Sequence, residues 1–146
     1  MGPSKRPSRA TDLPAEHVEE RELSRDHLEA VHSALARFWS LIQDPPDEQW
    51  RLMFEIAVAE IAANIVEHAN PPAITIRLRM AASSVVAEFT DSGTGWSGAT
   101  GPAAILDQLS ERGRGLALAQ SAVDEVAYER HGRVNHWRLT KHLSPA

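Results

Sequence analysis

The sequence lacks cysteine altogether, has a single tyrosine and carries no excess of positive charge. Without cysteine the chain cannot form a disulfide, a thiolate nucleophile or a zinc–thiolate site. A formal net charge of −5 argues against binding by phosphate neutralisation, so we expect no nucleic-acid partner. The sequence also lacks any apolar run near the roughly 20 residues that span a bilayer, and its polar N-terminus has no signal-peptide core. We therefore expect a cytoplasmic protein without a membrane partner.

The length and composition suit one folded domain with a polar leader. A chain of 146 residues can bury a core large enough to fold unaided. Residues 1–16 hold three prolines and few apolar side chains. The basic residues of this leader, Lys5, Arg6 and Arg9, could contact something anionic, although a solvated tail is the simpler interpretation. We predict a disordered tail over residues 1–16 and one domain over residues 17–146.

The hydrophobic pattern predicts helices and strands in a mixed order. Three- and four-residue spacing after a candidate N-cap at Ser24 indicates a helix, and period-2 alternation indicates strands. Residues 17–23 fit either an edge strand or a helix lead-in. The other expected elements are helices over 24–42, 47–69, 103–109 and 113–122, and strands over 74–80, 85–91, 125–129 and 134–143. This order predicts an α/β (α+β) fold, a two-layer sandwich whose mixed, mostly antiparallel sheet carries its helices on one face.

Two polar residues lie within the second expected helix, which is apolar nearly all round. Glu60 and Asn64 are four residues apart, so they share one line on the helix surface. A carboxamide oxygen suits Mg²⁺, and a neighbouring glutamate can deprotonate a nucleophile. The alternative is a buried Glu and Asn that are hydrogen-bonded in the core or in a dimer interface.

Two glycine-containing segments add further candidate contacts. Asp91 ends a strand and is followed by Gly93 and Gly95, where a carboxylate can accept a hydrogen bond from an amino group and glycine allows close approach to a flat ring. The Gly113-Arg114-Gly115 segment opens a helix, whose free N–H groups can bind an anion. A Gly-rich turn and an ordinary helix cap are the alternatives.

The three motifs in this order resemble the GHKL ATPase superfamily. Glu-x-x-x-Asn, Asp-x-Gly-x-Gly and Gly-x-Gly-Leu match its N, G1 and G2 boxes, and the resemblance covers residues 18–143. The spacing and the closing segment 137–143 are most similar to anti-sigma-factor serine kinases of the RsbW/SpoIIAB type. This resemblance implies a Bergerat-type ATP-binding fold with ATP and Mg²⁺ as cofactors.

The resemblance also implies a role for each matching residue. Glu60 would be the catalytic general base, and Asn64 would bind Mg²⁺. Asp91 would accept a hydrogen bond from the adenine amino group. The remaining nucleotide-binding residues would be Gly93, Gly95, Gly113, Arg114 and Gly115. Relatives carry a Gly-Thr pair near the last strand, and here Asn135 stands in that region as a candidate substitute.

A kinase of this type silences a sigma factor and phosphorylates a serine or threonine of a STAS-domain anti-anti-sigma protein. We therefore expect these two partners and a protein serine/threonine kinase activity. The alternative is a non-catalytic, nucleotide-dependent binding module that regulates a sigma factor or another signalling partner. Relatives commonly form homodimers, and we expect one here, with Phe38 and Trp39 as exposed-looking residues at a helix end.

Overall fold

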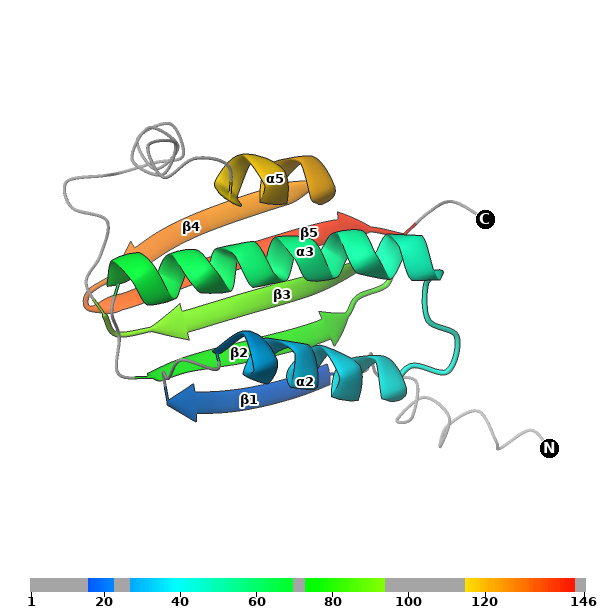
Figure 1. The fold of residues 1–146 in the computed structure, drawn as a ribbon, viewed down its shortest axis with the longest axis horizontal. Coiled ribbons are helices and arrows are strands. Elements are labelled where there is room, and N and C mark those ends of the chain that lie inside the picture. Colours follow the sequence, from blue (N-terminus) through cyan, green and yellow to red (C-terminus); the bar gives the residue numbers. More distant parts are fainter. Residues whose placement is uncertain (1–15, 23–26, 70–72, 94–114, 144–146) are drawn as a thin grey trace.

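The computed structural model describes residues 16–22, 27–69, 73–93 and 115–143 (Figure 1). In chain order, its elements are a first strand, two helices, a hairpin, a short helix and a second hairpin. Their bounds are β1 Glu16–Glu22, α2 His27–Ser40, α3 Glu48–Asn64, a π-helical turn η1 Ile65–Ala69, β2 Ala73–Met80, β3 Ser84–Asp91, α5 Gly115–Ala122, β4 Glu125–His131 and β5 Val134–His142. No helix in these ranges is long and apolar enough to cross a membrane. The expected helix over residues 103–109 and the candidate N-cap Ser24 lie outside them.

The strands form one sheet in the order β1-β2-β3-β5-β4. All four neighbouring pairs are antiparallel, so the described sheet has no parallel pair and the expectation of a mixed sheet was too broad. The ambiguous segment after the leader is the edge strand β1, which begins at Glu16 opposite Arg79. Strand β5 is the last in the chain but lies inside the sheet, between β3 and β4.

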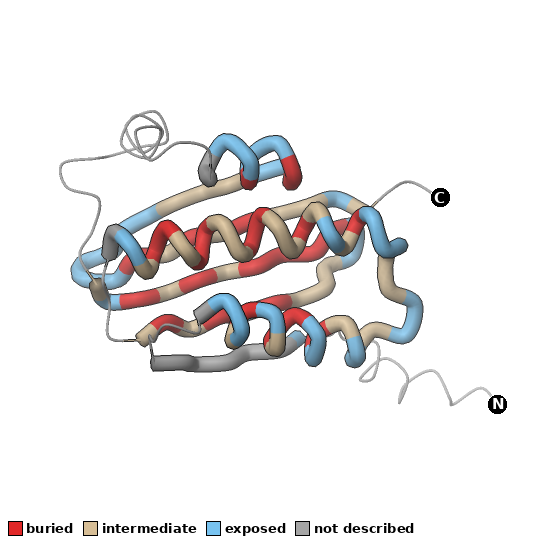
Figure 2. Tube along the Cα trace, in the orientation of Figure 1, coloured by how far each residue is buried: buried red, intermediate tan, exposed pale blue. Residues whose placement is uncertain are grey.

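The described helices α2, α3 and α5 cover one face of this sheet, which confirms the two-layer sandwich (Figure 1). Helix α3 runs along the strands over the middle of the sheet, α2 covers β1 and β2, and α5 lies beside β4. The buried parts of the tube follow the inner sides of α2 and α3 and the central strands (Figure 2). On β2 the residues Ile74, Ile76 and Leu78 are buried in alternation, as the period-2 pattern predicted.

Helix α2 buries an apolar stripe that includes Phe38. Val31, Leu35 and Phe38 follow at helical spacing and are almost fully buried, with no exposed surface left on Phe38. The expectation that Phe38 is exposed was therefore wrong, because it lies on the same stripe as the core residues before it. Trp39 is half-buried, and its indole Nε1 donates to Glu55 Oε2 over 2.7 Å. These two residues hold α2 to the rest of the fold rather than forming an open surface.

Helix α3 has a different structure at each of its ends. At the start, Asp47 is the N-cap and its carboxylate accepts from the Trp50 N–H over 2.8 Å. At the other end, the expected α-helix to residue 69 stops at Asn64, and residues Ile65–Ala69 form a π-helical turn. The predicted helix was thus right in extent but wrong in its last turn, which directly follows a candidate site residue.

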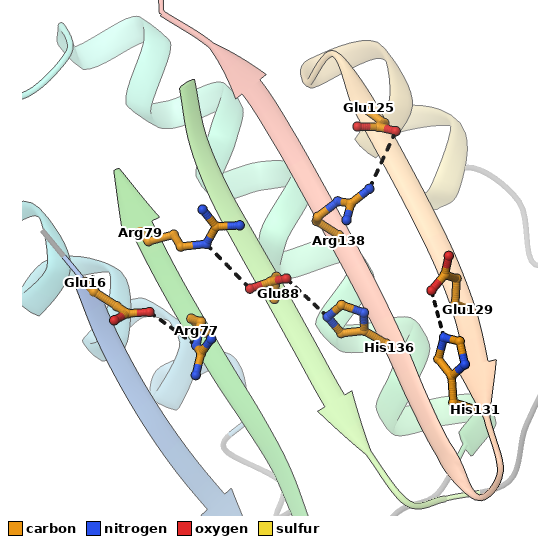
Figure 3. A network of polar contacts seen from close by, with 9 residues as sticks. All are labelled: Glu16, Arg77, Arg79, Glu88, Glu125, Glu129, His131, His136 and Arg138. Atoms are coloured by element: carbon orange, nitrogen blue, oxygen red, sulfur yellow. Dashed lines mark hydrogen bonds and ion pairs between the residues drawn. The ribbon is translucent and has the colours of Figure 1, made fainter. Parts of the chain in front are cut away.

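The sheet face turned away from the helices carries charged side chains (Figure 3). Glu88 on β3 is flanked by Arg79 on β2 and His136 on β5. Its Oε1 lies 3.7 Å from Arg79 Nε, and its Oε2 lies 3.3 Å from His136 Nε2. On β4, the exposed Glu129 carboxyl is hydrogen-bonded to the His131 ring. This hydrogen bond and the charge of His131 lower the pKa of the carboxyl from its ordinary value. This face is therefore polar and paired across strands, whereas the apolar core lies under the helices.

Candidate functional site

One end of the domain brings together the ends of several elements. The C-terminal end of α3, the end of β3, the end of β4 and the start of β5 all lie there (Figure 1). Antiparallel pairing sets Asp91, the last residue of β3, opposite Asn135 near the start of β5. Asp91 and Asn135, which were predicted from segments far apart in the sequence, therefore meet at this end of the sandwich.

The two candidate site residues of α3 occupy its last two turns. Asn64 is buried with 8% of its surface exposed, and Glu60 one turn earlier is half-buried. The side-chain nitrogen Nδ2 of Asn64 is buried without a hydrogen-bond partner among the described residues. An unsatisfied buried amide is costly, so this side chain is available for a ligand.

Asp91 is buried as well, and its two carboxylate oxygens differ. Oδ1 accepts from the Gly93 N–H over 2.7 Å and from Asn135 Nδ2 over 2.9 Å. The first of these bonds closes a local Asx turn directly after the strand. Oδ2 is buried and has no partner in the part of the chain that the structure describes. The carboxylate thus presents one vacant acceptor.

Asn135 has 1% of its surface exposed, and its amide is fully used. The Nδ2 group donates to Asp91 Oδ1 and, over 3.1 Å, to the Gly93 carbonyl oxygen. Oδ1 accepts from Tyr128 Oη over 2.6 Å and from Arg130 Nη1 over 2.7 Å. With two donated and two accepted bonds, this amide has filled its hydrogen-bond capacity with protein groups.

Sequence reasoning missed Tyr128 and Arg130, which both belong to β4. Arg130 also donates to the Gly93 carbonyl oxygen over 3.0 Å. The sequence of the β4–β5 turn, which contains Gly132, could have indicated Arg130. Gly132 has φ of 63°, a value that suits glycine at a tight turn. A tight turn there sets Arg130 directly opposite Asn135.

The glycines of the two predicted loops are only partly described. Gly93 is half-buried and belongs to the hydrogen-bonded group around Asp91. Gly115 is the first residue of α5, as expected for a helix-opening glycine. Gly95, Gly113 and Arg114 lie outside the described residues, so their predicted contacts remain predictions.

The described residues fit a nucleotide better than a metal site made by protein alone. The vacant Asp91 oxygen can accept from an exocyclic amino group, and the unsatisfied Asn64 amide lies on α3 at the same end of the domain. No group of three or more histidine, aspartate or glutamate side chains gathers among the described residues. A Mg²⁺ ion here would therefore take most of its oxygen ligands from phosphates and water, as is common for Mg²⁺.

Fold and site together define a one-sided antiparallel sandwich with two unsatisfied buried polar atoms, on Asn64 and Asp91, at one end of its described part. A family model described as the histidine kinase-like ATPase domain matches residues 20–141, and the chain belongs to this family. As an ATPase domain, the family implies ATP as the nucleotide.

A solved structure agrees with the fold. The crystal structure of the RsbU and RsbW domains of Rv1364c from Mycobacterium tuberculosis superimposes with a TM-score of 0.64 at 20% sequence identity. The match covers 90% of this chain and 33% of that one, so this chain spans about a third of its length. No curated protein matches the chain in sequence.

Proposed function

We propose that the chain is an ATP-dependent protein serine/threonine kinase that also binds and silences a sigma factor. The observation that carries the proposal is the buried, vacant Oδ2 of Asp91 at the same end of the domain as Asn64. Membership of the ATPase family supports ATP as the phosphoryl donor. The acceptor would be a serine or threonine of a STAS-domain protein, which follows from the motif resemblance.

In this proposal each site residue has a separate task. Asp91 would accept a hydrogen bond from the adenine amino group through Oδ2. The Asn64 amide would present its oxygen to Mg²⁺, which supplies charge neutralisation at the phosphates. Its unsatisfied Nδ2 could donate to a phosphate oxygen, so that one side chain holds two parts of the same ligand.

Glu60 would act as the general base, one helical turn before Asn64. The acceptor hydroxyl oxygen attacks the γ-phosphorus of ATP, the bond to the β,γ-bridging oxygen breaks, and ADP leaves. The hydroxyl proton passes to the Glu60 carboxylate. Because Glu60 is only half-buried, its carboxylate can be reached by a hydroxyl from a second protein.

Glu60→Gln tests the catalytic assignment while keeping the shape of the side chain. We expect phosphoryl transfer from labelled ATP to a STAS protein to fall by about 10²-fold or more, since general-base catalysis is lost. ATP affinity should stay close to that of the parent protein, because the amide removes a proton acceptor and no proposed ligand to the nucleotide. Both quantities can be measured on the same preparation, by filter assay and by calorimetry.

Glu48→Gln is the matched control, because Glu48 lies on the same helix at its far, exposed end. This variant should transfer phosphate at the parent rate. If the Glu60 variant instead keeps full transfer, Glu60 is not the base. If the parent protein binds ATP and a sigma factor but phosphorylates no STAS protein, the binding-module function replaces the kinase function.

A further inference from the structure

A chain of polar contacts runs from β4 through Asn135 to the vacant carboxylate oxygen of Asp91. Tyr128 and Arg130 approach the Asn135 amide from one side, with Oη and Nη1 at 2.6 and 2.7 Å from Oδ1. Asp91 and the Gly93 carbonyl approach it from the other side, at 2.9 and 3.1 Å from Nδ2. Both side chains thus contact Asn135, and Arg130 also contacts the Gly93 carbonyl, so they can act on the carboxylate through these two residues.

The chemistry of the two sides allows only one orientation of the amide. A guanidinium group can only donate hydrogen bonds, and an ionised carboxylate can only accept them. Arg130 must therefore face the oxygen of the Asn135 amide, and Asp91 must face its nitrogen. Turning the amide over would set its N–H groups against the guanidinium and its oxygen against the oxygens of Asp91 and Gly93, so three of the four hydrogen bonds would be lost, since only the Tyr128 hydroxyl can also accept.

This fixed orientation determines which oxygen of Asp91 remains free. Oδ1 already accepts from two N–H donors, those of Gly93 and Asn135. Only the buried Oδ2 is left to meet a ligand. A lone acceptor matches the amino group at position 6 of adenine and opposes the oxygen at position 6 of hypoxanthine or guanine.

We propose that Tyr128 and Arg130 are positioning residues that, through Asn135, hold Asp91 so that the site selects a 6-amino purine over a 6-oxo purine. This inference rests on the proposed nucleotide function. Asn135 then acts on the ligand through Asp91 rather than by direct contact, because its amide has no hydrogen-bond capacity to spare. Arg130 holds the loop as well, through the Gly93 carbonyl.

The test compares ATP with ITP, which differ at position 6 of the base, by calorimetry in the presence of Mg²⁺. Tyr128→Phe removes one hydroxyl and keeps the aromatic ring, whose centroid lies 4.8 Å from that of Trp137. Arg130→Met removes the donors and keeps much of the apolar stem. The quantity measured is the ratio of ATP to ITP affinity within each variant, so that a uniform loss of folded protein or of phosphate binding cancels.

We expect the parent protein to favour ATP over ITP by about tenfold or more, and each variant to lower that ratio by about three- to tenfold. Arg130→Lys, which can still donate to Asn135, should restore part of the ratio. Arg133→Met is the matched control, because Arg133 is exposed in the turn of the same hairpin, and it should leave the ratio unchanged.

The outcomes separate this inference from the proposed function. If the parent discriminates and both Tyr128→Phe and Arg130→Met keep the full ratio, the positioning role is overturned while ATP binding stands. If the parent binds ATP and ITP equally, Asp91 does not distinguish the substituents at position 6 of the base, and the inference is again overturned. If the parent binds neither nucleotide, the proposed function itself fails.

Discussion

At the scale of single residues, Asp91 combines burial with incomplete hydrogen bonding. Its side chain is held by two donors at Oδ1, and nothing among the described residues satisfies Oδ2. A buried carboxylate oxygen without a partner lowers the stability of a folded protein. Such a cost is typical of functional sites, where the missing partner is supplied by the ligand.

Asp91→Asn should change which base the site prefers. The new side-chain oxygen can take the place of Oδ1, since it meets the same two donors, and an NH₂ group then replaces the vacant Oδ2. That group repels the amino group of adenine but can donate to a 6-oxo oxygen. We expect ATP affinity to fall by about tenfold or more and ITP to bind at least as tightly as ATP, as measured by calorimetry.

The stability of the same variant provides its control. Replacing a buried charge that lacks one partner by a neutral amide should leave the melting temperature of the ligand-free protein unchanged or raise it. A lower affinity for both nucleotides in equal proportion would contradict the assigned role of Asp91 in base selection.

At the scale of elements, α3 connects a capped end of the domain with the end that carries the proposed nucleotide site. Its first turn is capped by Asp47 and anchored by Trp50, whose Nε1 donates to the His142 carbonyl oxygen over 3.0 Å. Its last turn carries Asn64. Stability and ligand binding can therefore be perturbed separately on one helix.

Asp47→Ala should lower the free energy of unfolding by about 1 kcal/mol, because the Trp50 N–H loses its capping acceptor. Chemical denaturation measures this change directly. The affinity for ATP should stay the same, since the cap lies at the far end of α3 from Asn64. A loss of ATP affinity would show that the two ends are not independent.

Much of the fold followed from local pattern in the sequence. The alternation of Ile74, Ile76 and Leu78 predicted β2, and the buried stripe of Phe54, Val58 and Ile61 predicted α3. These patterns are reliable because burial on one face imposes a period that the residues must follow. The glycine that opens α5 was recognisable for a similar local reason.

Other features depend on pairing between distant segments. The π-helical turn after Asn64 leaves no mark on the hydrophobic pattern, because a single wide turn does not alter which residues are apolar. The four bonds of Asn135 depend on the register of β5 against both β3 and β4. Single-sequence reasoning could identify Asp91 and Asn135 as candidates, but it could not show that one holds the other.

At the scale of the whole molecule, nucleotide binding should stabilise the domain. A ligand that binds only the folded state adds about 2.7 kcal/mol at 100 times its dissociation constant. For a domain of this size that corresponds to a rise in melting temperature of roughly 5–10 °C. We expect ATP with Mg²⁺ to produce this rise in differential scanning fluorimetry, and EDTA to remove most of it.

Two variants make the thermal measurement specific. Asn64→Ala should lose the part of the rise that depends on Mg²⁺. Asp47→Ala should start from a lower melting temperature and still show the full rise, because its defect is far from the site. An equal rise with and without EDTA in the parent protein would remove Asn64 as a magnesium ligand.

The bond between Asn135 and Asp91 joins residues 44 positions apart, and strand β5 reaches it only by entering between β3 and β4. The proposed nucleotide site therefore has no counterpart in a partly assembled chain, since Asp91 and Asn135 come from different strands. Nucleotide would bind only molecules whose sheet is closed around β5, and release of that one strand would release the ligand with it. Under the proposed function, ligand binding at this end is coupled to the assembly of the entire sheet, and a higher nucleotide concentration would make opening of the sheet rarer.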